Sequence, residues 1–233
     1  MCGRFVHYFT WQQIHDLLRA VLVTGDHVWR APEEGPAARY NQAPTQMAPI
    51  IIRDDNGLEG LMARWDFVPF FFKQPLETKK WTSINAKVEE ILEKPAFRTA
   101  IKSKRCLVPN NGFYEWKKEG AEKVPYWIRA MDSPISFFGG IWDYWEGQHK
   151  GETVHFHSFA VLTCAPNSLV APIHNRMPVI IRPEDYETWM FGNRDKALKI
   201  AHDPYPAQMM SATPVDKAVG NVKNDYRGLL GVK

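Results

Sequence analysis

Residues 50–65 read IIIRDDNGLEGLMARW. Two apolar runs flank Asp55, Asn56 and Gly57 in this stretch. An Asn-Gly pair between apolar runs is the strongest short-range signal for a β-hairpin, because both residues tolerate a positive φ. The stretch therefore predicts a hairpin that turns at Asn56 and Gly57.

Aromatic and β-branched runs predict further strands along the chain. They lie at residues 3–8, 105–108, 112–117, 124–129, 137–142, 155–163, 179–181 and 209–212. Within 112–117, period-2 alternation places Phe113, Glu115 and Lys117 on one face, and Tyr114 and Trp116 on the other. A carboxylate among large aromatic rings is poorly solvated, which raises its pKa and suits it to proton transfer. An exposed strand glutamate is the simpler alternative.

Helices are predicted where apolar residues recur at helical spacing. Thr10 and Gln13 have the spacing of a capping box, and the residues that follow have one apolar face. Residues 83–90 and 96–101 also have a helical pattern, interrupted at Pro95, in which Asn85 would be a cap. A further helix is predicted to begin at Pro183, which acidic residues follow.

Composition is typical of one compact intracellular domain. The chain has 233 residues, of which 45% are apolar and 13% aromatic, and it contains neither a repeat nor a linker-like tract. The net charge of +3 permits nucleic acid as a partner without requiring it. Cys2, Cys106 and Cys164 are widely separated, which argues against a disulfide framework or structural zinc. No apolar run is long enough to span a bilayer, so we expect a cytoplasmic protein.

The first four residues, MCGR, carry distinctive chemistry. If an aminopeptidase or the protein itself removes Met1, Cys2 presents an α-amine and a thiol on adjacent carbons. The amine titrates at roughly 7.7–8.0 and the thiol at about 8.5, so both are reactive near neutral pH. Together they can condense with an aldehyde. The alternative is that Cys2 is only a small residue after the initiator.

Three other segments could contact a ligand. Residues 67–81 interleave aromatics with lysines, which indicates either a platform for unpaired bases or a loop packed onto the core, and we favour the second. His174 and Arg176 lie on a predicted loop before a strand, where they could supply a titratable donor and a phosphate clamp. His155 and His157 share a strand face, but no third ligand is evident, so we expect no metal.

Four segments in order resemble one known family. They are MCGR at residues 1–4, SINA at 83–86, GFYEW at 112–116 and IHNRMP at 173–178. The set is similar to the SOS-response-associated peptidase (SRAP) family, whose members act as abasic-site processing proteins in the DNA damage response. Weaker matches at residues 40–45, 65–69 and 105–109 extend the resemblance over almost the whole chain.

The resemblance implies an α+β fold: a single mixed domain over residues 1–233, mainly antiparallel β in barrel-like sheets with peripheral helices. It implies that Cys2 is the nucleophile and that Asn85 and His174 hold or protonate the opened deoxyribose. By the same matching, Glu115 transfers protons. Family members are also credited with a peptidase activity that exposes Cys2, so hydrolase chemistry is expected beside the DNA chemistry.

The resemblance also implies a DNA surface. The DNA-binding residues carried over by position are Arg4, Asn41, Trp65, Lys87, Trp116, Thr163 and Arg176. The expected partner is single-stranded DNA with abasic sites, including sites at junctions with double strands, bound by a monomer that associates with the nucleoid. No cofactor is expected. The chain departs from the family pattern at Asp66, Lys87 and Asn175, where glycine, arginine and aspartate are usual.

The expected chemistry can also be argued from the functional groups. The α-amine of Cys2 attacks the aldehyde of an opened abasic sugar to form a Schiff base, and the thiolate closes on the imine carbon to give a thiazolidine. Elimination from the imine would cleave the strand, so weak lyase activity is expected. Two alternatives stay open: a glutamine amidotransferase with an N-terminal cysteine, and a module that binds single strands noncovalently.

Overall fold

The structure is a computed structural model, and it describes residues 3–22 and 28–231. Its β-strands form two sheets. The five-stranded sheet has the order β14-β9-β8-β1-β3. These strands are β1 (Phe5–His7), β3 (Arg39–Gln42), β8 (Phe113–Glu119), β9 (Glu122–Ala130) and β14 (Met210–Pro214).

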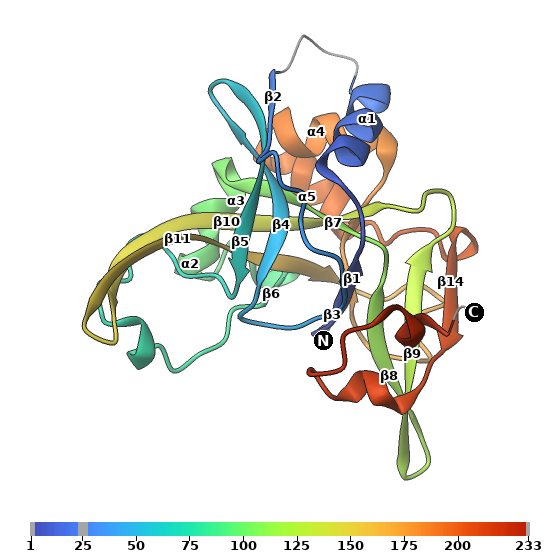
Figure 1. The fold of residues 1–233 in the computed structure, drawn as a ribbon. Helices are drawn as coiled ribbons and strands as arrows, with labels where there is room; N and C mark the ends of the chain where they lie inside the picture. The colour runs from blue at the N-terminus through green and yellow to red at the C-terminus, as the bar shows by residue number, and fades with distance from the viewer. Residues whose placement is uncertain (1–2, 23–27, 232–233) are drawn as a thin grey trace.

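The second sheet is nine-stranded, and the path β12-β11-β10-β7-β4-β5-β2 runs through it. Its strands are β2 (Val28–Arg30), β4 (Met47–Asp54), β5 (Gly57–Trp65), β6 (Asn85–Lys87), β7 (Arg105–Asn110), β10 (Ser136–His149), β11 (Glu152–Cys164), β12 (Met177–Pro178) and β13 (Ile180–Ile181). The hairpin of β10 and β11 is long and curved, and it reaches away from the rest of the molecule (Figure 1). The predicted α+β fold with mainly antiparallel strands is confirmed.

The predicted hairpin at residues 50–65 is β4 and β5. Asp54 lies opposite Gly57, so the turn falls at Asp55 and Asn56, one residue before the predicted position, and Gly57 is the first residue of β5. Gly57 has a φ of 132°, and a side chain there would collide with the backbone of Val28 on the adjacent strand β2. Glycine is therefore required at this position both for its conformation and for the approach of β2.

Helices lie at the periphery of the sheets (Figure 1). They are α1 (Trp11–Val21), α2 (Pro95–Arg98), α3 (Ala100–Ser103), α4 (Tyr186–Phe191) and α5 (Arg194–His202). The capping box of α1 is confirmed, because Thr10 Oγ1 accepts from Gln13 N at 3.2 Å and Gln13 Oε1 accepts from Thr10 N at 2.9 Å. Within the part of the chain that the structure describes, no helix could cross a membrane.

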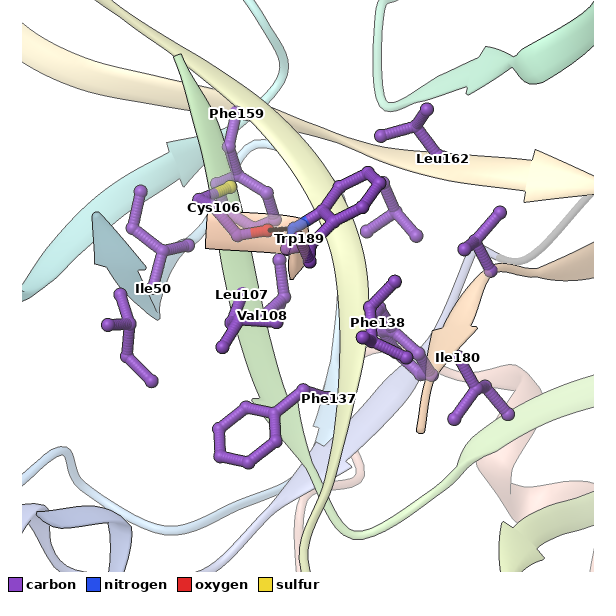
Figure 2. Close-up of a cluster of buried hydrophobic side chains, with 14 of the residues drawn as sticks. Ile50, Cys106, Leu107, Val108, Phe137, Phe138, Phe159, Leu162, Ile180 and Trp189 are labelled. Atoms are coloured by element: carbon purple, nitrogen blue, oxygen red, sulfur yellow. Dashed lines mark hydrogen bonds between the residues drawn. The ribbon is translucent and has the colours of Figure 1, made fainter. Parts of the chain in front are cut away.

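The main hydrophobic core lies where β7 and β10 meet α4 (Figure 2). Phe137 and Phe138 from β10 are fully buried, as is Trp189 from α4. Trp189 Nε1 donates to Cys106 O at 2.9 Å, which fastens α4 to β7. Cys106 is thus an apolar core residue, and its burial raises the pKa of its thiol.

The alternation predicted for residues 112–117 is confirmed. Phe113 belongs to the main core, whereas Tyr114 and Trp116 pack in a second cluster with Val219 and Leu229. The two faces of β8 therefore contact different cores. This second cluster ties the C-terminal segment to the five-stranded sheet.

One helix prediction is wrong, and one helix was not predicted. Residues 83–90 do not begin a helix: Asn85, Ala86 and Lys87 form β6, which pairs in parallel with β11. A neighbouring strand supplies hydrogen bonds that the local helical pattern could not reveal, so Asn85 is a strand residue and not a cap. In addition, α5 occupies residues for which no helix was predicted.

Candidate active site

Glu115 and His174 line one cavity. The cavity has a volume of about 400 Å³, and its other lining residues are Trp116, Lys123 and Gly220. Glu115 comes from β8, Lys123 from β9, and His174 from the loop before β12. Two residues that were predicted to be catalytic from separate motifs thus meet at one site.

Glu115 is 3% exposed. Burial raises the pKa of its carboxyl group, and the charge of His174 partly offsets that rise. The direction agrees with the prediction from the aromatic strand. A carboxyl group with a raised pKa can take up and release a proton closer to neutral pH than an exposed one.

His174 is held by the backbone of Arg176. Its Nδ1 lies 3.0 Å from Arg176 N and 3.2 Å from Arg176 O. A neutral ring can accept at Nδ1 from the amide, and a protonated ring can donate from Nδ1 to the carbonyl. Nδ1 therefore has a hydrogen-bond partner in both protonation states, which suits a group that exchanges protons.

The side chain of Arg176 is engaged within the protein. Its two terminal nitrogens donate to the carboxylate of Glu89 at 2.7 and 2.8 Å, and Nη2 also donates to Thr163 O. This bidentate pair fixes the loop that carries His174 against β11 and the 3₁₀ turn η2 (Val88–Glu90). A DNA phosphate at Arg176 would have to compete with Glu89.

Asn85 lines a different cavity. Its strand β6 pairs with β11, and Asn85 lies opposite Val161. The cavity has a volume of about 380 Å³. It is lined by Trp81, Thr82, Ser83, Asn85, Lys87, Glu90, Lys94, Pro95, Ala96 and Phe97. Lys87 is exposed there and pairs with Glu90 at 2.8 Å.

Three residues that were predicted to bind DNA have buried side chains. Trp65 and Thr163 are 0% exposed, and Asn41 is 2% exposed. Trp65 Nε1 donates to Ile84 O at 2.8 Å, just before Asn85. These side chains support the surface from beneath, because the large ring and the polar groups have their partners inside the protein.

Asn41 and Arg4 hold the C-terminal segment. Asn41 Nδ2 donates to the carbonyls of Val219, Asn221 and Asn224 at 2.8–3.1 Å. Arg4 Nη1 donates to Asn41 Oδ1 at 2.8 Å and to Val219 O at 3.1 Å. This network positions Gly220 at the edge of the cavity that contains Glu115. Met1 and Cys2, the predicted nucleophile, lie outside the described residues.

The aromatic loop at residues 67–81 divides into two groups. Phe67, Val68 and Phe72 are buried, as favoured from the sequence. Phe70, Phe71 and Trp81 are 46–50% exposed. The prediction of a packed loop is therefore correct for two of the five aromatic residues in this segment.

Sequence reasoning missed Lys123 and Glu89. Lys123 lies on β9, paired with Lys118 of β8, and only the folded structure shows that it lines the cavity. Glu89 follows the SINA segment, but only the folded loop reveals its pairing with Arg176. Among the described residues, no group of three side chains could bind a metal, and this includes the surroundings of His155 and His157.

Comparisons with known proteins find similarity over nearly the whole chain. A family model described as SOS response associated peptidase (SRAP) matches residues 1–222. The abasic site processing protein YoaM of Bacillus subtilis (strain 168) is 33% identical over 233 residues, which cover 99% of this chain and 97% of YoaM. The abasic site processing protein HMCES of Xenopus tropicalis is 27% identical over 97% of this chain and 76% of its own length.

A solved structure shares the fold. The crystal structure of a protein from Bacteroides thetaiotaomicron superposes with a TM-score of 0.75 at 26% identity, covering 93% of both chains. The family match extends over nearly all of the sequence, including the segments that carry Glu115 and His174. The chain belongs to the SOS response associated peptidase (SRAP) family.

Proposed function

We propose that this protein processes abasic sites in single-stranded DNA by forming a covalent thiazolidine crosslink through Cys2. The observation that carries the proposal is the cavity shared by Glu115 and His174. It provides a buried carboxyl group and a histidine side by side, as reversible condensation with an aldehyde requires. The names of YoaM and HMCES support abasic sites as the lesion.

The reaction begins when loss of Met1 exposes the amine of Cys2. The amine attacks the aldehyde carbon of the ring-opened sugar, and the resulting carbinolamine expels its hydroxyl group as water. That departure needs a proton on the oxygen, which Glu115 or His174 supplies. The thiolate of Cys2 then adds to the imine carbon, and the nitrogen takes up a proton. One water is released for each thiazolidine formed.

His174, and Asn85 from its separate cavity, have the second role of holding the open sugar. An amide side chain can donate to and accept from the sugar hydroxyl groups, and imidazole can protonate the oxygen that leaves. Removal of Met1 by the protein itself would use the same carboxyl group to activate water. Elimination at the imine stage would give weak lyase activity.

A denaturing gel tests the proposal. The purified protein is incubated with a single-stranded oligonucleotide that contains one abasic site. We expect a heat-stable shifted band that Cys2→Ala abolishes. The matched control is the same oligonucleotide with a tetrahydrofuran residue, which has no aldehyde and should give no band. Absence of an adduct with protein that has lost Met1 would refute the proposal.

A further inference from the structure

The cations predicted from sequence to bind phosphate are engaged by protein groups. Arg176 is paired with both oxygens of Glu89. Lys87 is paired with Glu90 at 2.8 Å, and Arg4 donates to Asn41 Oδ1. Each of these would have to exchange a protein partner for a phosphate.

Lys123 differs from these residues in two respects. It lines the same cavity as Glu115 and His174, and its side chain is exposed. Across the described ranges 3–22 and 28–231, it makes no ion pair, whereas the nearby Lys117 pairs with Glu119 at 3.0 Å and Lys217 with Glu122 at 2.8 Å. Lys123 is therefore a lining residue of the cavity whose charge no carboxylate of the described residues neutralises.

The chemistry of an abasic nucleotide determines what this cation would meet. The sugar carries a phosphate on each side, through its 3′ and 5′ oxygens. Only a few covalent bonds join the aldehyde carbon to these phosphates, so an aldehyde held beside Glu115 and His174 brings a phosphate within reach of the rim of the same cavity. A lysine ammonium group binds phosphate as a compact point charge with three donors.

We propose that Lys123 binds a DNA phosphate next to the abasic nucleotide and thereby holds the aldehyde in the cavity. The assignment rests on the proposed function, since it takes the substrate to be an abasic strand. Lys123 lies on β9, whose pairing with β8 fixes its backbone relative to Glu115. The contact therefore holds the DNA strand in place relative to the reacting groups. It also adds a salt-dependent part to the affinity for DNA.

Lys118 provides a matched control. It carries the same charge, is exposed, and lies directly opposite Lys123 in the β8–β9 hairpin. It is not among the residues that line the cavity. A general effect of net charge would be the same for both lysines, whereas a specific phosphate contact would depend on Lys123 alone.

The test measures noncovalent binding at several salt concentrations. The ligand is a single-stranded oligonucleotide with a central tetrahydrofuran residue, which cannot crosslink. For Lys123→Gln, we expect the slope of log affinity against log salt to become shallower by about 0.7, the value for one phosphate contact with a single strand. Lys118→Gln should keep the wild-type slope, and Lys123→Arg should restore it.

Two results would overturn the assignment: an unchanged slope in Lys123→Gln, or an equal change in both glutamine variants. Because Lys123 is exposed, the variant should fold, and its melting temperature verifies this. Adduct formation by the wild-type protein with a true abasic site is measured in parallel. If the wild-type protein forms no adduct, the proposed function is wrong. If it forms the adduct normally but Lys123→Gln has the same salt slope as the wild type, only the role of Lys123 is wrong.

Discussion

At the scale of single residues, the burial of Glu115 is unfavourable for its charged form but suits the group to proton transfer. Its burial disfavours the charged carboxylate, and the same burial makes the group a better proton donor near neutral pH. The neighbouring His174 keeps a hydrogen bond at Nδ1 in either protonation state. Glu115 and His174 are therefore suited to proton transfer and not to binding the DNA backbone.

Replacing Glu115 by Gln should therefore slow chemistry without weakening binding. We expect adduct formation to fall by about 100-fold or more, the range for loss of a general acid or base. The affinity for the tetrahydrofuran oligonucleotide should change little, because the amide keeps the shape of the side chain. Single-turnover adduct kinetics and anisotropy measure the two quantities. A large loss of affinity with an unchanged rate would contradict the role of Glu115.

The burial of His7 leads to a prediction of how the stability of the fold changes at low pH. It is 1% exposed, and its Nε2 lies 3.1 Å from Gln42 Oε1. Gln42 Nε2 donates to Ala43 O and Met47 O, which directs Oε1 toward the ring. Burial lowers the pKa of His7 to about 4, and the hydrogen bond to Gln42 only partly opposes that shift.

A lowered histidine pKa makes stability fall as the pH falls. The unfolded chain takes up the proton near pH 6.5, whereas the folded chain does so only near pH 4. Above pH 6.5 His7 is neutral in both states and causes no loss of stability. Between pH 6.5 and pH 4 the difference in proton uptake lowers the free energy of unfolding by about 3 kcal/mol. Urea unfolding from pH 7 to 4 should show a steeper decline for wild type than for His7→Gln. Parallel curves for the two proteins would exclude this role.

At the scale of elements, Arg105 joins helices to the sheet. It lies on β7 and is 6% exposed. Its guanidinium group donates to Trp189 O at 2.6 Å and Ile101 O at 3.0 Å, and also to the carbonyls of Lys102 and Gly192. One side chain thus satisfies carbonyls at the ends of both α3 and α4.

Loss of this side chain should destabilise both helix ends. For Arg105→Met we expect the free energy of unfolding to fall by about 3 kcal/mol, because buried carbonyls lose their donors. The control Arg194→Met removes an arginine whose side chain is 39% exposed and pairs with its neighbour Asp195, and it should change stability by less than about 0.5 kcal/mol. Chemical denaturation measures both variants. Equal effects would show that the helix ends do not depend on Arg105.

The elements also show what sequence alone could predict. The β4–β5 hairpin and the capped helix α1 follow from local signals, namely Asn56-Gly57 and Thr10 with Gln13. Strand β6 could not be predicted in this way, because only its pairing with the distant β11 makes residues 85–87 extended. The same pairing places Asn85, so its position depends on a nonlocal contact.

At the scale of the whole molecule, the fold brings distant motifs together. Glu115 and Lys123 come from the five-stranded sheet, and His174 comes from the loop that leads into β12 of the nine-stranded sheet. Motif resemblance singled out Glu115 and His174, which the fold places at one cavity. It could not identify Lys123, nor the pairing of Arg176 with Glu89, because each depends on how the loops and strands fold in three dimensions.

The whole structure also distinguishes residues that support the surface from residues that form it. Asn41 and Trp65 belong to segments that resemble the family, and Thr163 was matched to it by position, yet all three side chains are buried. A motif residue can be required because it holds a loop in place. Only burial, which the sequence does not state, distinguishes that role from contact with a ligand.

The most direct test of the central claim is the intact mass of the adduct. Wild-type protein is incubated with a single-stranded oligonucleotide that contains one abasic site and analysed by mass spectrometry without reduction. We predict a species whose mass equals the protein without Met1 plus the oligonucleotide minus one water. An adduct that retains Met1, or one that forms equally with Cys2→Ala, would contradict a thiazolidine at Cys2.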